Sequence, residues 1–286
     1  MPSTWTVRDR QLLLDRPLVM GIINVTPDSF SDGGRYESVD EAVARAGHLL
    51  REGADILDIG GESTRPQGAT EVSEDVEARR VVPVIERVVG LYPDAVISVD
   101  TVKSGVAETA VAAGARIVND VSAFRLDARM AEVCARTGVG VVLMHSRGGI
   151  SDMASYARAT YGANALDEVL SELQARVDVA LSAGVERARI ALDPGLGFSK
   201  RSGDSLRLLA RLDRLAAWGF PIVVGASRKR FIGELTGGEP SERLFGSVGA
   251  AVAAYERGAH VLRAHDVAAT RQALDVAAAI RAAGAA

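Results

Sequence analysis

Residues 95–100 of the chain read AVISVD, an apolar run of strand length that turns polar at its last residue, Asp100. Seven further runs share this pattern, apolar until the carboxyl end and polar there. They are residues 18–24 (LVMGIIN), 54–61 (ADILDIGG), 116–120 (RIVND), 139–145 (VGVVLMH), 189–193 (RIALD), 221–229 (PIVVGASRK) and 260–266 (HVLRAHD). Polar chemistry at the carboxyl ends of parallel strands is typical of a (β/α)8 barrel.

Helical patterns separate these runs, and most of them end at or near a glycine. The predicted helices span residues 39–52, 73–89, 103–113, 127–137, 164–183, 204–218, 242–257 and 267–282. Strands that alternate with such helices pair in parallel through right-handed crossovers. Residues 5–15 (WTVRDRQLLLD) alternate like a short hairpin, which we expect to plug the bottom of the barrel. We therefore predict an α/β fold in which residues 1–286 form a single (β/α)8 TIM barrel with a short N-terminal hairpin.

Composition excludes several classes of function. With 24% charged residues and a net charge of −4, the chain has no basic patch that would indicate nucleic acid. No apolar run approaches the ~18 residues of a membrane span, and no Gly-x-Gly-x-x-Gly follows the first strand. The single cysteine, Cys134, rules out an internal disulfide and is interpreted as a buried core thiol. We expect a cytoplasmic enzyme that binds neither nucleic acid nor a membrane.

Four polar side chains end four of the predicted strands: Asp58, Asp100, Asn119 and Asp193. A carboxylate inside an apolar barrel is costly unless it meets a hydrogen-bond donor. Several together suggest a ligand rich in N–H groups, such as a guanine-like or pterin edge. Any one of them could instead be a helix cap or a rim ion pair.

A second, cationic group follows the last two strands. Ser227, Arg228 and Lys229 would open a helix just after the seventh strand, while Arg263 and His265 alternate along one strand. Loops after the seventh and eighth strands often bind anions in this architecture, and Ser227 as an N-cap would favour a carboxylate or a phosphate. For Arg228 an ion pair is the favoured interpretation. Lys229 leaves a Schiff-base aldolase open.

Three long connections lie on the same face as the polar residues: residues 26–35, 62–70 and 146–162. Long loops on a rigid scaffold are often functional lids, although we assign the third no role. His145 is interpreted as a rim residue whose ring nitrogens have hydrogen-bond partners, and Met144 as a residue that packs against its neighbours. Phe198 and Phe30 could enclose an aromatic substrate. The sequence contains no metal-binding box, but one or two protein oxygens suffice for a Mg²⁺ carried on a pyrophosphate, and the Asn24 oxygen would serve.

Seven ordered segments resemble the signatures of bacterial dihydropteroate synthases. They are residues 20–34 (MGIINVTPDSFSDGG), 58–66 (DIGGESTRP), 97–101 (ISVDT), 118–121 (VNDV), 192–198 (LDPGLGF), 225–233 (GASRKRFIG) and 263–267 (RAHDV). The resemblance covers nearly the whole chain. It implies a transferase of folate biosynthesis that joins 6-hydroxymethyl-7,8-dihydropterin pyrophosphate to p-aminobenzoate and releases pyrophosphate.

The resemblance also implies a role for each matching residue. Asp100, Asn119, Asp193 and Lys229 would hold the pterin, with Met144 and Asp58 supporting the pocket. Arg263, His265 and Asn24 would bind the pyrophosphate, with Mg²⁺ at Asn24. The p-aminobenzoate pocket would be formed by Asp28, Phe30, Asp32, Thr64, Arg65, Pro66 and Phe198, and Ser227 would receive its carboxylate. The residues expected to act in catalysis are Asp100, Lys229, Arg263, His265, Asp28 and Arg65.

Two further expectations follow from the resemblance. The family is commonly dimeric, and the small residues of the last two helices permit close packing, so we expect a homodimer. Gln67 is one residue more than the common STRPGA form, but the segments GESTRP and GASRK are intact, so we expect an ordinary sulfonamide-sensitive enzyme. The alternatives are a pterin-binding methyltransferase barrel, which would not need the cationic group, and a non-catalytic pterin-binding barrel.

Overall fold

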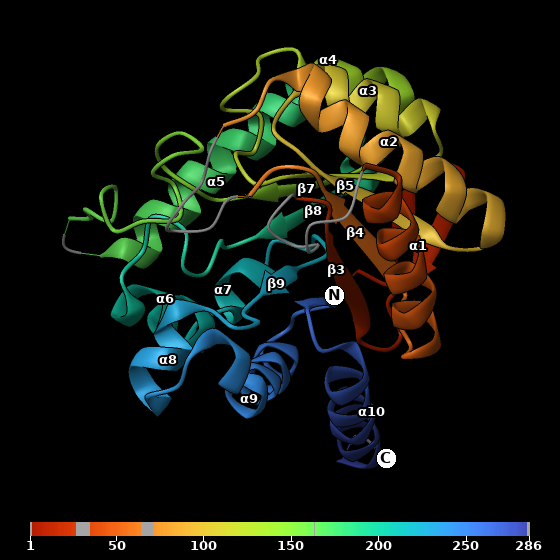
Figure 1. Cartoon of the computed structure of the whole chain (residues 1–286). Coiled ribbons are helices and arrows are strands. Elements are labelled where there is room, and N and C mark those ends of the chain that lie inside the picture. Colours follow the sequence, from red (N-terminus) through yellow and green to blue (C-terminus); the bar gives the residue numbers. More distant parts are fainter. Residues whose placement is uncertain (1, 27–34, 64–70, 163, 285–286) are drawn as a thin grey trace.

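An eight-stranded parallel sheet forms the centre of the protein, in a computed structural model that describes residues 2–26, 35–63, 71–162 and 164–284 (Figure 1). Of residues 35–38 only the backbone is described. The strands are β3 (Leu18–Asn24), β4 (Ile56–Gly60), β5 (Val96–Asp100), β6 (Ile117–Asp120), β7 (Gly140–Met144), β8 (Ile190–Asp193), β9 (Val223–Gly225) and β10 (Val261–Ala264). Their spatial order is β8-β7-β6-β5-β4-β3-β10-β9, and an isolated parallel bridge between Leu192 and Ile222 joins β8 to β9. The predicted (β/α)8 barrel is confirmed.

Helices surround this sheet and connect its strands (Figure 1). They are α1 (Arg35–Arg51), α2 (Glu74–Leu91), α3 (Ser104–Ala112), α4 (Met130–Thr137), α5 (Ala165–Ser182), α6 (Ser202–Ala210), α7 (Asp213–Ala216), α8 (Arg230–Thr236), α9 (Leu244–Glu256) and α10 (Val267–Gly284), with short 3₁₀ turns at Arg187–Arg189 and Pro240–Glu242. The helix predicted over residues 204–218 is divided into α6 and α7, because the backbone leaves the helical region at Arg211 (φ −116°, ψ 32°). The short helix α8 is an addition to the regular alternation.

The glycines that were predicted to end helices do so by adopting left-handed backbone geometry. All six have positive φ: Gly53, Gly114, Gly138, Gly184, Gly219 and Gly258. Glycine has no Cβ and reaches this region without strain, so it ends a helix and turns the chain toward the next strand. These glycines therefore mark the boundaries between helices and strands that were predicted from the sequence.

The N-terminal hairpin closes the amino end of the barrel, as predicted. Its strands β1 (Thr4–Val7) and β2 (Arg10–Leu13) pair antiparallel, and the side chains of Trp5 and Val7 are fully buried. Trp5 Nε1 donates a hydrogen bond to the Arg189 carbonyl at 2.9 Å. The two side chains pack on an apolar layer inside the barrel, to which every strand contributes: Leu18, Met20, Ile56, Val96, Ile117, Val142, Ala191, Val223 and Val261. The barrel is therefore a packed core at this end and not a pore.

The outward-facing strand residues form the second part of the core, against the helices. Both faces of the strands are buried, which explains why they read as nearly continuous apolar runs. Cys134 of α4 lies in this core, so the prediction of a buried core thiol is confirmed, and its burial raises the pKa of the thiol. None of the described helices is long and apolar enough to cross a membrane.

Candidate active site

The candidate site begins one layer above the apolar interior of the barrel. Two residues further along a strand, the side chain returns to the same face of the sheet. This step leads from Ile56 to Asp58, from Ala191 to Asp193, and from Val261 to Arg263. The complete second layer comprises Ile22, Asp58, Ser98, Asn119, Met144, Asp193, Gly225 and Arg263. Five of the predicted site residues are therefore brought into a single interior layer.

Arg263 lies at the centre of this layer and pairs with two carboxylates. Its Nε donates to Asp58 Oδ2 at 2.6 Å, and its Nη2 donates to Asp100 Oδ2 at 2.7 Å. Asn119 Nδ2 also donates to Asp58 Oδ2, at 3.1 Å. Side chains from β4, β5, β6 and β10 thus form one connected group, which spans 205 residues of sequence between Asp58 and Arg263.

Burial shapes the electrostatics of this group. It raises the pKa of Asp100 to about 7, an effect that Arg263 opposes and the neighbouring Asp58 reinforces. Burial also works against the charge of Arg263, but Asp58 and Asp100 together hold its pKa above the ordinary value. Asp58 is fully buried, and its Oδ1 has no hydrogen-bond partner among the described residues. The site is therefore rich in acceptors and holds one permanent cation.

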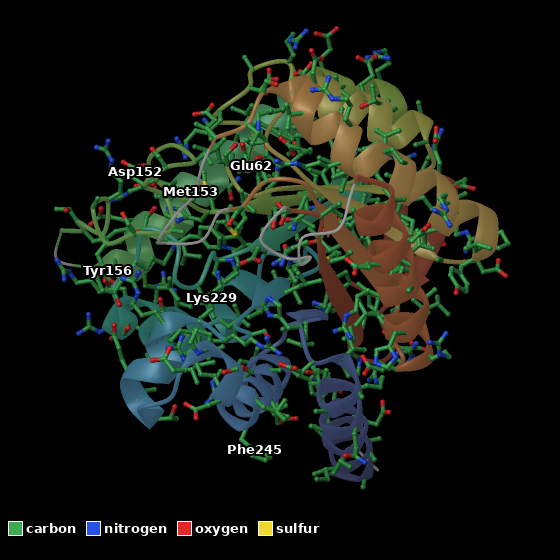
Figure 2. The ribbon with its side chains drawn as sticks, in the orientation of Figure 1. Glu62, Asp152, Met153, Tyr156, Lys229 and Phe245 are labelled. Atoms are coloured by element: carbon green, nitrogen blue, oxygen red, sulfur yellow. The ribbon has the colours of Figure 1, made fainter. Side chains whose placement is uncertain are left out.

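A second pair of ionisable groups lies on the opposite arc of the barrel. Burial raises the pKa of Asp193 to about 6, and its Oδ1 accepts a hydrogen bond from Gly195 N at 2.6 Å. Burial and the nearby Arg263 lower the pKa of Lys229 to about 8. Lys229 Nζ lies 3.9 Å from the centre of the Phe198 ring, and Figure 2 shows this lysine near the middle of the barrel. A flat aromatic group and an ammonium group thus lie in direct contact.

The segment after β9 is arranged differently from the prediction. Ser227 is not an N-cap: α8 begins at Arg230, and Lys229 occupies the cap position without a side-chain hydrogen bond. The Ser227 hydroxyl instead contacts His265 Nδ1 at 3.0 Å and accepts from His265 N at 3.2 Å. Arg228 pairs with both carboxylate oxygens of Asp266, so the favoured interpretation of Arg228 as an ion pair is confirmed.

His265 is held as a neutral imidazole. Burial, with Arg263 and Arg228 nearby, lowers its pKa to about 3. Asn24 ends β3 on the same side of the barrel and is half-buried, with no hydrogen-bond partner for its side chain among the described residues. The remaining predicted site residues, Asp28, Phe30, Asp32, Thr64, Arg65 and Pro66, lie outside the described residues, as does Gln67.

An apolar wall completes the mouth. Met144 and Phe198 pack in one cluster with residues of the loop between β7 and α5 and with two residues that follow β5 and β6: Val102, Val121, Ile150, Met153 and Ala154. The prediction that Met144 packs is confirmed. The loop to which no role was assigned contributes three members of this cluster.

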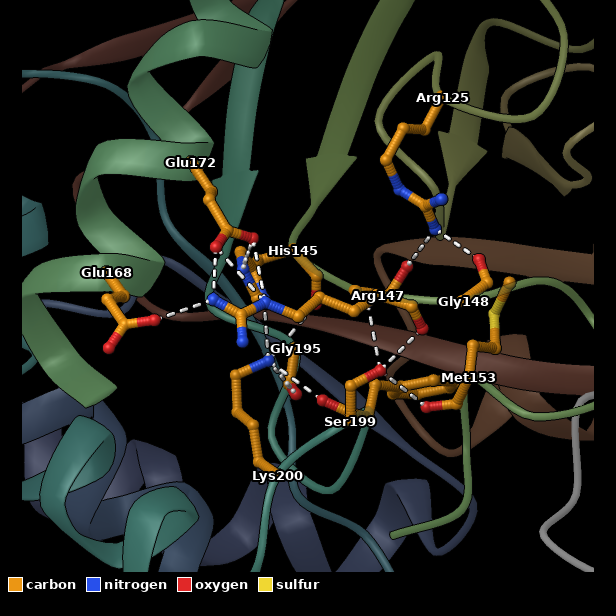
Figure 3. Close-up of polar contacts among 12 residues, drawn as sticks. Arg125, His145, Arg147, Gly148, Met153, Glu168, Glu172, Gly195, Ser199 and Lys200 are labelled. Carbon is orange, nitrogen blue, oxygen red and sulfur yellow. Dashed lines mark hydrogen bonds and ion pairs between the residues drawn. The ribbon is translucent and has the colours of Figure 1, made fainter. Parts of the chain in front are cut away.

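Sequence reasoning missed one buried group beside the site. Lys200, which follows Phe198 by two residues, is fully buried and lies 2.8 Å from His145 Nδ1 (Figure 3). A signal was present in the composition: the chain has only three lysines among its 33 lysine and arginine residues, namely Lys103, Lys200 and Lys229. His145 itself is buried and fully hydrogen-bonded, as the rim-residue interpretation required.

Comparison with known proteins gives consistent matches. The family model described as pterin binding enzyme matches residues 20–265. The dihydropteroate synthase of Bacillus subtilis (strain 168) is 45% identical over 253 residues, which cover 88% of this chain and 85% of that protein. The structure of Xanthomonas albilineans dihydropteroate synthase with 4-aminobenzoic acid is 48% identical, with a TM-score of 0.91 and 99% of each chain covered. Yersinia pestis dihydropteroate synthase in a sulfonamide drug complex is 40% identical, with a TM-score of 0.90 and coverage of 98% and 99%.

Fold, interior layer and family match define a pterin-binding barrel enzyme. Within that class, the chain belongs to the dihydropteroate synthase family and is a transferase of folate synthesis. The alternatives of a methyltransferase barrel, a non-catalytic binding barrel and a Schiff-base aldolase are thereby set aside.

Proposed function

We propose that the chain joins 6-hydroxymethyl-7,8-dihydropterin pyrophosphate to p-aminobenzoate, forming 7,8-dihydropteroate and pyrophosphate, and that the described site residues divide into a pterin pocket and a leaving-group pocket. The observation that carries the proposal is the interior layer in which Arg263 donates to Asp58 and, beyond the layer, to Asp100, with Asn119 bound to the same Asp58 oxygen and Asp193 buried in the same layer. Solved relatives with 4-aminobenzoic acid and with 7,8-dihydropteroate support the substrates.

The pterin pocket would be formed by Asp193, Asn119, Asp100 and Lys229. A carboxylate can accept a ring N–H and an exocyclic amine at once, and an amide can both donate and accept. Because burial holds the pKa of Asp193 at about 6, donors on the ligand would favour its ionised form, and binding would release a proton below that pH. Met144 would pack against the flat ring, and Phe198, whose ring centre lies 3.9 Å from Lys229 Nζ, would border the adjoining p-aminobenzoate pocket.

The leaving-group pocket would be formed by Arg263, His265 and Asn24. Arg263 supplies the permanent positive charge, while His265, whose pKa is about 3, would act as a neutral hydrogen-bond donor through Nε2 because its Nδ1 faces Ser227. With the Ser227 hydroxyl committed to His265, a p-aminobenzoate carboxylate at Ser227 would use the backbone or share that hydroxyl.

Mg²⁺ fits this pocket as a ligand of Asn24. The Asn24 amide oxygen has no partner among the described residues, and Mg²⁺ prefers oxygen ligands with only one or two from the protein when phosphates complete its shell. No group of three or more histidine, cysteine or acidic residues able to hold a metal occurs in the described part of the chain, so the remaining ligands would come from the substrate and water. When bound, the ion would neutralise charge on the departing pyrophosphate.

The reaction itself would need positioning and charge stabilisation more than a base. The bond between the pterin methylene carbon and the pyrophosphate oxygen breaks, and the amine nitrogen of p-aminobenzoate forms the new bond and then loses a proton to water or to pyrophosphate. Carboxylates such as Asp100 would favour the cationic pterin, and Arg263 would stabilise the anion. The amine is neutral at pH 7, so the reaction requires neither a general base nor a covalent nucleophile.

Pyrophosphate release tests the proposal directly. Purified protein is mixed with dihydropterin pyrophosphate and Mg²⁺, with and without p-aminobenzoate, and pyrophosphate and dihydropteroate are quantified. We expect release that depends on p-aminobenzoate and equals the dihydropteroate formed. Binding of the pterin without release would contradict the synthase assignment. A sulfonamide should compete with p-aminobenzoate, and inhibition as weak as in resistant forms would contradict the expected sensitivity.

A homodimer in the cytoplasm is the expected state of the enzyme. Large apolar side chains are exposed on α9 and α10: Phe245 at 85%, Val276 at 57% and Ile280 at 68%. Figure 2 labels Phe245. We expect these side chains to be covered by a second copy. Light scattering should give a dimer for the native chain and a monomer for Phe245→Ser with Ile280→Ser, while Leu91→Ser, an exposed position on α2, should leave the dimer intact.

A further inference from the structure

We propose that Lys200 is a positioning residue of this enzyme: it fixes residues 193–198 so that Asp193 and Phe198 present their side chains to the substrate pocket. The inference rests on the proposed function and deepens it. Lys200 lies behind the pocket wall and touches neither substrate directly.

Lys200 Nζ is surrounded by acceptors. It lies 2.8 Å from His145 Nδ1, 3.2 Å from the His145 carbonyl, 3.0 Å from the Gly195 carbonyl and 2.9 Å from the Phe198 carbonyl (Figure 3). The side chain is fully buried. Burial lowers the pKa of Lys200 to about 7, although Asp193 and Glu172 oppose this shift. In its ammonium form the group has three donors and no acceptor, so these four contacts use all its hydrogens. A single side chain thereby joins the end of β7 to the turn that follows β8.

The partner of Lys200 is itself held in one tautomer. Because Nδ1 of His145 accepts from Lys200, Nε2 carries the proton and donates to Glu172 Oε2 at 3.1 Å. Glu172 is further bound by Arg147 Nε at 3.1 Å, and Arg147 Nη2 donates to Glu168 at 2.9 Å. Two cations and two carboxylates thus alternate around His145, and the chain of contacts ends on α5 (Figure 3).

The turn that Lys200 binds is tight and conformationally costly. Gly195, Gly197 and Ser199 all have positive φ, of 67°, 77° and 49°. A Cβ at Gly195 would lie 2.0 Å from the His145 carbonyl oxygen. Within the turn, Gly195 N donates to Asp193 Oδ1 and Phe198 N donates to the Gly195 carbonyl. The geometry that orients Asp193 is therefore continuous with the carbonyls to which Lys200 donates.

The residue type supports the same conclusion. In this chain arginine supplies 30 of the 33 lysine and arginine residues, yet a lysine stands at this position. A planar guanidinium group directs its donors in one plane, whereas an ammonium group can serve acceptors on several sides. The three carbonyls and the ring nitrogen around Lys200 Nζ therefore require an ammonium group.

The first test compares Lys200→Met with Leu274→Ala, a fully buried position in α10 at which truncation lowers stability without reaching the pocket. Affinity for dihydropterin pyrophosphate is measured by calorimetry, and KM for p-aminobenzoate and kcat by turnover. We expect Lys200→Met to weaken pterin binding at least ~10-fold and to raise KM for p-aminobenzoate, while Leu274→Ala stays within twofold of the native enzyme. Equal losses of pterin affinity and equal changes in KM for p-aminobenzoate in the two variants would overturn the proposal.

A double-mutant cycle separates positioning from general stability. If Lys200 acts through Asp193, then Lys200→Met in an Asp193→Asn background should weaken pterin binding by less than ~3-fold further. Independent, additive losses would overturn the proposal.

A measurement on the native chain covers the case in which Lys200→Met does not fold. With only three lysines, ¹³C labelling of lysine gives three side-chain signals, which single Lys→Arg variants assign. We expect the Lys200 signal to shift when the pterin binds, although Lys200 does not contact it. An unchanged Lys200 signal, with the Lys229 signal shifted, would refute the positioning role. Native enzyme that fails to release pyrophosphate would instead refute the proposed function, so the two failures are distinguishable.

Discussion

Two layers inside the same barrel, separated by two residues along each strand, differ in almost every property. The lower layer is apolar and is sealed by Trp5 and Val7 of the hairpin. The upper layer contains Asp58, Asn119 and Arg263 and is bordered by ionisable groups whose pKa values are displaced. Because both layers use the same strands, the difference shows that stability and chemistry are assigned to opposite ends of one set of strands. Substitutions in the two layers should therefore have separable effects.

The largest effect is expected for Arg263→Gln in the upper layer. The change leaves Asp58 and Asp100 without their cation and removes the charge that would stabilise pyrophosphate, so kcat/KM should fall roughly 10³-fold. The free energy of unfolding should fall by about 3 kcal/mol, because one partner of a buried pair is lost. Pyrophosphate release and urea unfolding measure the two quantities.

Arg116→Gln is the matched control for Arg263→Gln. Arg116 lies at the amino end of the barrel, where its Nε contacts an exposed Asp9. It should leave kcat/KM nearly unchanged. A similar loss of activity in both variants would remove the distinction between the layers.

Trp5→Ala in the lower layer should produce the reverse pattern. It removes a fully buried indole and its hydrogen bond to the Arg189 carbonyl, at a cost of about 3–5 kcal/mol in stability. At a temperature at which the variant is folded, kcat/KM should remain within a factor of about three. Urea unfolding together with turnover checks both parts, and a variant of native stability with impaired turnover would contradict the comparison.

Asp193→Asn tests how the upper layer couples to pH. In the folded chain the pKa of Asp193 is about 6, above its value of 3.8 in the unfolded chain, so the folded state retains a proton that the unfolded state loses. Stability from this group is therefore full below pH 4 and is lost as pH rises through 6, by an amount on the order of 3 kcal/mol. We expect Asp193→Asn to flatten urea-unfolding stability between pH 4 and pH 7 and to weaken pterin binding about 100-fold. An unaltered pH profile would contradict the raised pKa.

The smallest effect is expected for Ser98→Ala. Ser98 belongs to the upper layer, but its buried hydroxyl has no partner among the described residues, and no role is proposed for it. Removing an unpaired polar group should change stability by less than about 1 kcal/mol, in the stabilising direction. Turnover should stay within twofold. A large loss of activity would show that the whole layer, and not a subset of it, acts on substrate.

Much of this arrangement could be predicted from local sequence. The alternation of apolar runs and helical segments, with glycines such as Gly53 and Gly258 at positive φ, identified the barrel and its strand ends. Polar residues at those ends identified the site, because a barrel gathers the carboxyl ends of its strands. Both signals depend only on residues close together in the sequence, so they can be read without knowing the tertiary contacts.

What could not be predicted depends on contacts between distant strands. The pairing of Arg263 with both Asp58 and Asp100 follows from the barrel's closure and has no local signal. The interpretation of Ser227 as an N-cap was wrong, because its hydroxyl is bound to His265 from the neighbouring strand and the helix begins three residues later. Lys200 lies in a segment without periodicity, so only the scarcity of lysine could have marked it.

The closure between β8 and β9 gives the barrel an uneven stiffness. Other neighbouring strands pair through three to five residues, but this junction has the single bridge between Leu192 and Ile222, and Pro221 beside it has no N–H to extend the ladder. At this junction the barrel is therefore closed by backbone pairing at a single position. Asp193 follows Leu192 of this bridge on one strand, and the segment that leads to Lys229 follows Ile222 on the other. We expect thermal opening of the barrel to be greatest at this junction, next to the two groups proposed to bind the pterin, and a bound pterin would hold its two sides together.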